Sequence, residues 1–86
     1  MNLKTINLKI LLFAAARDLC ETSEAQIELP QSATVADLKV ELIKSFPQLQ
    51  PILSRSAISV DHQYADDQVE LNESSEVAII PPVSGG

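Results

Sequence analysis

The sequence predicts a single α+β domain in which one main helix packs across one face of a mixed β-sheet. Two strongly apolar segments, 5–13 and 76–80, have the composition of buried strands. Between them, residues 34–46 carry an apolar stripe at helical spacing. The order of segments (strand, short helix, strand, long helix, two short strands, strand) fits one sheet with one helical layer. At 86 residues the chain has room for one domain, which we expect over 1–80, followed by an extended tail over 81–86.

The first strand is expected over residues 5–13. Isoleucine or leucine stands at every second position from Ile6 to Leu12, and the segment becomes continuously apolar toward Phe13. We therefore expect a strand that begins with one solvated face and ends with both faces covered, in the middle of a sheet. The next seven residues, 14–20, favour helix by propensity, with room for one or two turns.

A second strand and the main helix follow. Residues 24–29 alternate between apolar and polar side chains, and Pro30 follows them. This pattern indicates a strand with one solvent-exposed face, near a sheet edge. Thr34 is a good N-cap residue, and Asp37 stands three positions later as a short version of the capping-box acid. The expected buried stripe of this helix consists of Val35, Leu38, Leu42 and Phe46.

The remaining elements are short. Residues 49–53 indicate a helical turn on the core, and 57–60 a strand. Residues 61–63 predict a hairpin turn that returns through Tyr64 and Ala65. In the last strand, 76–80, the side chains of Ala78 and Ile80 should face opposite to those of its other apolar residues. The first and last strands are the natural central neighbours, and a parallel pairing would require a right-handed crossover.

Composition excludes several classes of function. The net charge is −6, with 6 Lys and Arg against 12 Asp and Glu, which argues against nucleic acid and anionic membranes and suits a basic protein partner. Cys20 is the one cysteine, so neither a disulfide framework nor a cysteine metal site is expected. The first residues are too polar for a signal peptide, and the longest apolar run, 10–16, is far too short to span a membrane. We expect a soluble, cytoplasmic protein without a bound metal.

The end of the chain is its most informative segment. It reads Pro81, Pro82, Val83, Ser84, Gly85, Gly86, and its two glycines are the only two in the sequence. Two successive residues without a Cβ make a thread narrow enough for the channel of another protein, while the prolines disfavour helix. We expect residues 81–86 to form an extended arm that presents the Gly86 carboxylate as a chemical group. The plainer alternative is an uninformative chain end.

Three stretches resemble one known family. Residues 80–86 with Glu76–Ala78 before them look like the end of the small, sulfur-carrying subunit of molybdopterin synthase. Residues 12–19 are similar to that family's first strand and short helix, and 34–38 to the start of its main helix. The resemblance implies a ubiquitin-like β-grasp fold. Two departures are Ile79 and Ile80 in place of aromatic residues, and a turn at 72–75 without its usual glycine.

The resemblance also implies a reaction cycle. An activating enzyme that uses ATP and Mg²⁺ would adenylate the Gly86 carboxylate, and a sulfur donor protein would convert it to a thiocarboxylate. The tail would then enter the large synthase subunit and donate sulfur to cyclic pyranopterin monophosphate, forming molybdopterin. The family's assembly of two small and two large subunits is implied as well. The carrier itself would bind no permanent cofactor, and the sequence offers no convincing general acid or base.

Candidate partner-binding residues are Phe13, Ile80, Leu11 and Arg17. A sheet covered by one helix leaves its other face open, so the three apolar residues belong either to a docking patch or to the core. Arg17 is either a surface charge or a contact to the partner or tail. The alternatives to molybdopterin synthesis are a carrier for thiamin or transfer-RNA thiolation, a protein modifier attached through Gly86, and an interaction module with an inert tail.

Overall fold

Five strands form one mixed sheet in the order β2-β1-β5-β3-β4 over residues 4–82, the part of the chain that the computed structural model describes. The strands are β1 (Thr5–Leu12), β2 (Glu24–Pro30), β3 (Ala57–Val60), β4 (Gln63–Ala65) and β5 (Val77–Ile80). Strand β1 pairs antiparallel with β2, and β3 pairs antiparallel with both β4 and β5. The sheet therefore contains every strand that the sequence predicts, and β2 lies at its edge as expected.

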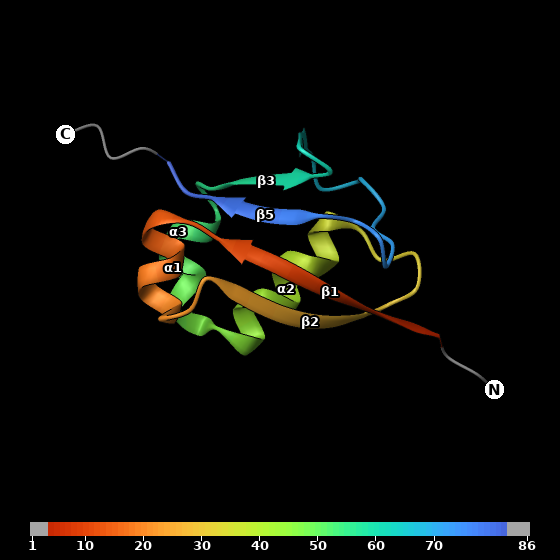
Figure 1. The fold of residues 1–86 in the computed structure, drawn as a ribbon, viewed down its shortest axis with the longest axis horizontal. Coiled ribbons are helices and arrows are strands. Elements are labelled where there is room, and N and C mark those ends of the chain that lie inside the picture. The colour runs from red at the N-terminus through yellow and green to blue at the C-terminus, as the bar shows by residue number, and fades with distance from the viewer. Residues whose placement is uncertain (1–3, 83–86) are drawn as a thin grey trace.

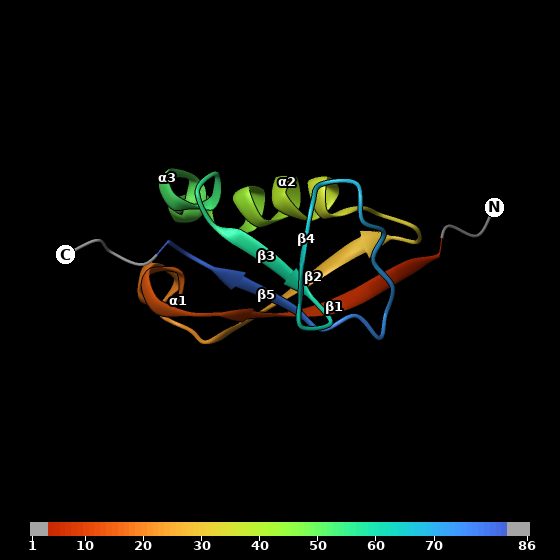
Figure 2. The same ribbon diagram turned by 90° about the horizontal axis from the view of Figure 1, so that it is seen from above.

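The helices occupy one side of this sheet and one of its ends. They are α1 (Ala14–Cys20), α2 (Val35–Ser45), the 3₁₀ turn η1 (Pro47–Leu49) and α3 (Gln50–Leu53). Figure 2 shows α2 and α3 on one side of the sheet, with α1 beside the end where β1 and β5 stop. The other face carries no helix among the described residues, as Figure 1 shows with the strands in front.

A complete capping box starts α2. The Thr34 hydroxyl accepts a hydrogen bond from the Asp37 backbone N–H at 3.4 Å, and the Asp37 carboxylate accepts one from the Thr34 N–H at 2.9 Å. Two backbone donors that the first turn would leave unpaired are satisfied in this way. The sequence prediction of this helix start is confirmed.

The parallel pair at the centre of the sheet joins the first strand to the last. Ile10 lies beside Val77, Leu11 beside Ala78, and Leu12 beside Ile79. All other elements belong to the connection between these two strands. The last strand, β5, completes the sheet at the position between β1 and β3. This confirms the expectation that the two most apolar strands are central neighbours.

The core lies between the sheet and α2. Its fully buried members include Leu8, Ile10, Leu12, Leu29, Val35, Leu38, Leu42, Leu49, Val77 and Ile79. The predicted helical stripe faces it, although Phe46 is only partly buried.

One prediction about β1 is wrong. The strand ends at Leu12, and the side chain of Phe13 is 47% exposed, so the end of the segment is not covered on both faces. The reason is that no helix of the described chain lies over the second face of the sheet.

Candidate functional site

The strand register gathers a row of small and apolar side chains on the open face of the sheet. Leu11 of β1 lies beside Ala78 of β5, which pairs with Ser59 of β3, and Ser59 pairs with Tyr64 of β4. Because side chains alternate between faces along a strand, Phe13 and Ile80 lie on the same face as Leu11 and Ala78. This row crosses four strands with its smallest side chains in the middle.

A cleft of about 180 Å³, here called the open-face cleft, lies over this row. It is lined by Leu11, Phe13, Ser59, His62, Glu76, Val77, Ala78 and Ile80. The structure therefore brings together Leu11, Phe13 and Ile80, three of the four residues predicted to bind a partner. Arg17 is exposed on α1 and is not among the lining residues.

One wall of the open-face cleft is polar, and sequence reasoning missed it. His62 Nε2 lies 3.2 Å from Glu76 Oε2. The hairpin turn is also tied to β5, because the Asp61 N–H donates to the Glu76 carbonyl at 2.8 Å and the Asp61 carboxylate accepts from the Glu76 N–H at 2.9 Å. The alternation of 76–80 already places Glu76 and Ala78 on one face, but nothing in the sequence says that the turn reaches them.

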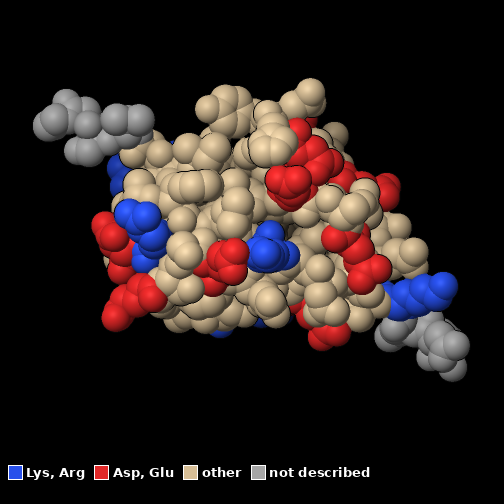
Figure 3. All heavy atoms as spheres, in the orientation of Figure 1, with Lys and Arg blue, Asp and Glu red and all other residues tan. Residues whose placement is uncertain are grey.

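The other half of the same face is polar. Lys9 of β1 pairs with Glu24 of β2 at 3.6 Å, and the Thr5 hydroxyl donates to Glu28 at 3.0 Å. Figure 3 views this face and shows a mostly uncharged area toward the C-terminal end, with acidic groups to both sides. The apolar surface of the open face is thus confined to the part around the C-terminal end of β5.

The predicted tail begins directly after a residue that lines the open-face cleft. Ile80 ends β5 and lines the cleft, Pro81 is buried, and Pro82 is exposed. The other predicted tail residues, Val83, Ser84, Gly85 and Gly86, lie outside the described residues. The roles assigned to them from the sequence stay predictions.

The described residues offer little chemistry of their own. Burial raises the pKa of the half-buried Cys20 thiol, so less of the nucleophilic thiolate is available at neutral pH. Between residues 4 and 82, no three His, Cys, Asp or Glu side chains are grouped as metal ligands. No helix in this range is long and apolar enough to span a membrane.

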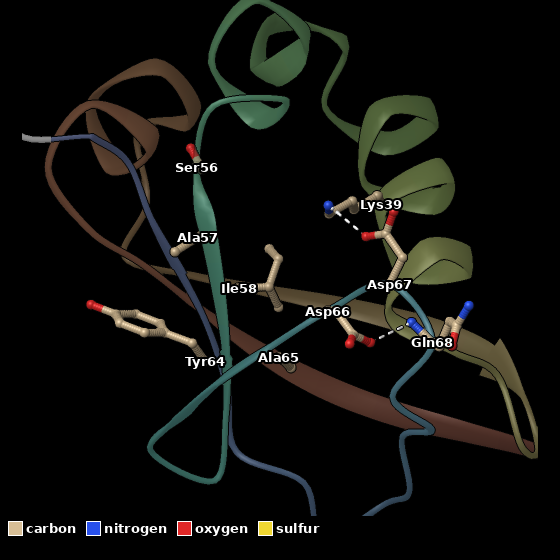
Figure 4. Close-up of a pocket in the computed structure, with 9 residues that line it drawn as sticks. All are labelled: Lys39, Ser56, Ala57, Ile58, Tyr64, Ala65, Asp66, Asp67 and Gln68. Atoms are coloured by element: carbon tan, nitrogen blue, oxygen red, sulfur yellow. Dashed lines mark hydrogen bonds and ion pairs between the residues drawn. The ribbon is translucent and has the colours of Figure 1, made fainter.

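A second, larger hollow of about 520 Å³ lies between β3, β4 and α2. Figure 4 shows Lys39 and Asp67 paired on one side of it, with 2.7 Å between Nζ and Oδ1, while Tyr64 points away from this pair. Tyr64 is 79% exposed. None of the predicted site residues that lie between 4 and 82 lines this hollow. It is therefore separate from the open-face cleft.

Comparison with known proteins gives consistent similarities. A sequence model of the ThiS family matches residues 10–86. The molybdopterin synthase sulfur carrier subunit of Arabidopsis thaliana is 33% identical over 82 residues, covering 95% of this chain and 85% of that protein. A structure of the putative molybdopterin converting factor, subunit 1, of Pyrococcus furiosus is 29% identical, with a TM-score of 0.82 over 91% of this chain and 99% of that one.

The fold also matches a protein of a different name. The crystal structure of SAMP1 from Haloferax volcanii has a TM-score of 0.83 and covers 93% of this chain and 99% of that one. Its sequence identity is 22%, so the likeness concerns the fold alone. The expected β-grasp architecture is confirmed.

Proposed function

Because this chain belongs to the ThiS family of ubiquitin-like β-grasp proteins, we propose that it is the sulfur carrier subunit of a molybdopterin synthase. The observation that carries the proposal is the extent of the similarity, since the family match continues through Gly86. Relatives that are about one third identical to this chain over nearly its whole length bear the name molybdopterin synthase sulfur carrier subunit. The role in this proposal is that of the cytoplasmic, non-catalytic sulfur-donor subunit of this sulfurtransferase.

Activation begins at the Gly86 carboxylate. A carboxylate is a poor electrophile, so an activating enzyme first transfers AMP to it from ATP with Mg²⁺ and releases pyrophosphate. A sulfur donor protein then delivers sulfide-level sulfur to the acyl carbon: a carbon–sulfur bond forms, the carbon–oxygen bond to AMP breaks, and the product is a thiocarboxylate. ATP and Mg²⁺ belong to the activating enzyme in this cycle, and the carrier keeps neither.

Transfer follows in the large synthase subunit. The thiocarboxylate sulfur is a strong nucleophile at neutral pH and forms a carbon–sulfur bond with cyclic pyranopterin monophosphate as a carbon–oxygen bond of that substrate breaks. Water then cleaves the bond between this sulfur and the acyl carbon, which returns Gly86 to the carboxylate. Each carrier brings one sulfur and the dithiolene needs two, so two carriers are consumed per molybdopterin.

Docking uses the open-face cleft. It offers exposed apolar surface at the root of the tail, and such surface marks a protein contact in a small domain. The acidic composition of the chain favours a partner with a basic groove, and salt should weaken that attraction.

A mass measurement tests the proposal against its alternatives. Incubation with the activating enzyme, ATP, Mg²⁺ and a sulfur donor should replace one oxygen of the carrier by sulfur, with the change located at Gly86 by fragmentation. The thiolated carrier should then lose that sulfur to cyclic pyranopterin monophosphate when the large subunit is added. A protein modifier would instead form conjugates of higher mass, and a carrier for thiamin or transfer-RNA thiolation would keep its sulfur in this assay.

Substitution of Phe13 by Asp should weaken binding to the large synthase subunit by at least about 1–2 kcal/mol. Phe13 contributes exposed apolar surface to the open-face cleft, and a carboxylate there would lose water without gaining a partner. Calorimetric titration measures the affinity, and circular dichroism checks the fold.

Val40→Asp is the matched control for this variant. Val40 is another exposed apolar side chain, 56% exposed, but it belongs to α2 on the opposite side of the sheet. Its substitution should leave the affinity unchanged. Equal binding by a folded Phe13→Asp protein and by wild type would remove Phe13 from the docking surface.

A further inference from the structure

The length of the tail determines which surface the partner must cover. Gly86 lies six residues beyond Ile80. Six residues span at most about 20 Å when fully extended. A large subunit whose active site receives Gly86 therefore has to contact the surface around Ile80. The exposed apolar part of that surface is the open-face cleft.

The open-face cleft is hollow because of one small side chain. Ala78 lies in the row between Leu11 and Ser59, and Ser59 is buried. Leu11, Phe13 and Ile80 border the same hollow. Its volume of about 180 Å³ equals the liquid volume of about six water molecules, which is room for one large side chain.

The polar wall of the cleft, which His62 and Glu76 form, is held in place by Asp61, a residue that does not itself line the cleft. Asp61 and His62 both have left-handed backbone conformations, with φ of 53° and 68°, as a tight hairpin turn requires. Two hydrogen bonds tie Asp61 to Glu76, and the His62 side chain is paired with the Glu76 carboxylate. His62 Nε2 and Glu76 Oε2 are thus paired within the carrier, and both side chains stay largely exposed, so an apolar side chain that packs over Ala78 can leave their other polar atoms in contact with water.

We propose that the open-face cleft is a specificity pocket, in which one large apolar side chain of the large synthase subunit packs over Ala78 against the wall formed by His62 and Glu76. This inference rests on the proposed function and adds to it the identity of the recognition element. The small residue at 78 admits the anchor, and the pinned hairpin turn limits its size. A partner without an apolar anchor leaves the cleft empty and docks weakly.

The test fills the pocket with a larger side chain of the carrier itself. Ala78→Val and Ala78→Leu add apolar volume where the anchor should lie, and binding of the large subunit encoded by the same genome is measured by calorimetry. We expect the dissociation constant to rise with the size of the new side chain, by about tenfold or more for leucine. Ala36→Leu is the control, because Ala36 is exposed on α2, away from the open face.

The possible results distinguish an error in the proposed pocket from an error in the proposed carrier function. Unchanged binding by folded Ala78→Leu, beside a wild type that binds and transfers sulfur, overturns the pocket and leaves the carrier function standing. If the leucine variant does not fold, unchanged binding by Ala78→Val overturns the pocket in the same way. Failure of the wild-type carrier to bind the large subunit overturns both.

Discussion

Deletion of Gly86 is expected to abolish sulfur transfer while the melting temperature stays almost unchanged. The buried core of the described residues extends from Ile6 to Ile79, and Gly86 has no side chain that could add to a core, so its removal should cost little stability. The reacting group in the proposed cycle is the carboxylate of Gly86 itself. Addition of one alanine after Gly86 should have the same effect, because it converts that carboxylate into an amide.

The measurement compares three carriers: the unaltered chain, the chain without Gly86, and the chain extended by one residue. Each is supplied to the activating enzyme and sulfur donor, and then to the large subunit with cyclic pyranopterin monophosphate. Gln26→Ala, an exposed change on β2 away from the open-face cleft, serves as a control that keeps full turnover. Turnover by the chain without Gly86 would show that the sulfur-carrier proposal is wrong.

Replacement of Leu38 by alanine should lower the free energy of unfolding by roughly 2–5 kcal/mol. Leu38 is fully buried on the face of α2 that packs against the sheet. The truncation removes apolar surface from the core and leaves a cavity that the surrounding side chains fill only in part. In a domain of 86 residues this is a large share of the total stability.

Chemical denaturation monitored by circular dichroism measures this change. Val40→Ala provides the comparison, because it also shortens an apolar side chain on α2 but at an exposed position. We expect that variant to remain within about 0.5 kcal/mol of wild type. A similarly small loss for Leu38→Ala would mean that the helical stripe does not form the core.

The fold was predictable because local patterns and the global arrangement agree. The capping-box residues Thr34 and Asp37 stand at the start of a stripe with helical period, and the structure starts α2 there. The alternation in 5–12 and 24–29 determines which side chains face the core, and these residues form β1 and β2 with that pattern of burial. The high apolar content of the first and last strands distinguished them, as the central pair, from the other predicted strands.

The candidate site was predictable only in part. Phe13, Leu11 and Ile80 could be named because a one-helix sheet leaves a face open. The pairing of His62 with Glu76 could not, since it depends on where the hairpin turn ends relative to β5. That position is determined by long-range register: Asp61, which ties the turn to Glu76, is 15 residues away from it in sequence, and neither segment carries a local signal of the contact.

The placement of β5 has a mechanical consequence. In the proposed cycle, any pull on the tail would be transmitted to β5, the strand that precedes it. Strand β5 is clamped between β1 and β3, and its parallel pairing with β1 means that tension between the start of β1 and the tail pulls the two strands in opposite directions along their length. The hydrogen bonds between them then share the load together, whereas an edge strand would peel away one bond at a time. The domain should therefore survive repeated insertion and withdrawal of its tail without unravelling.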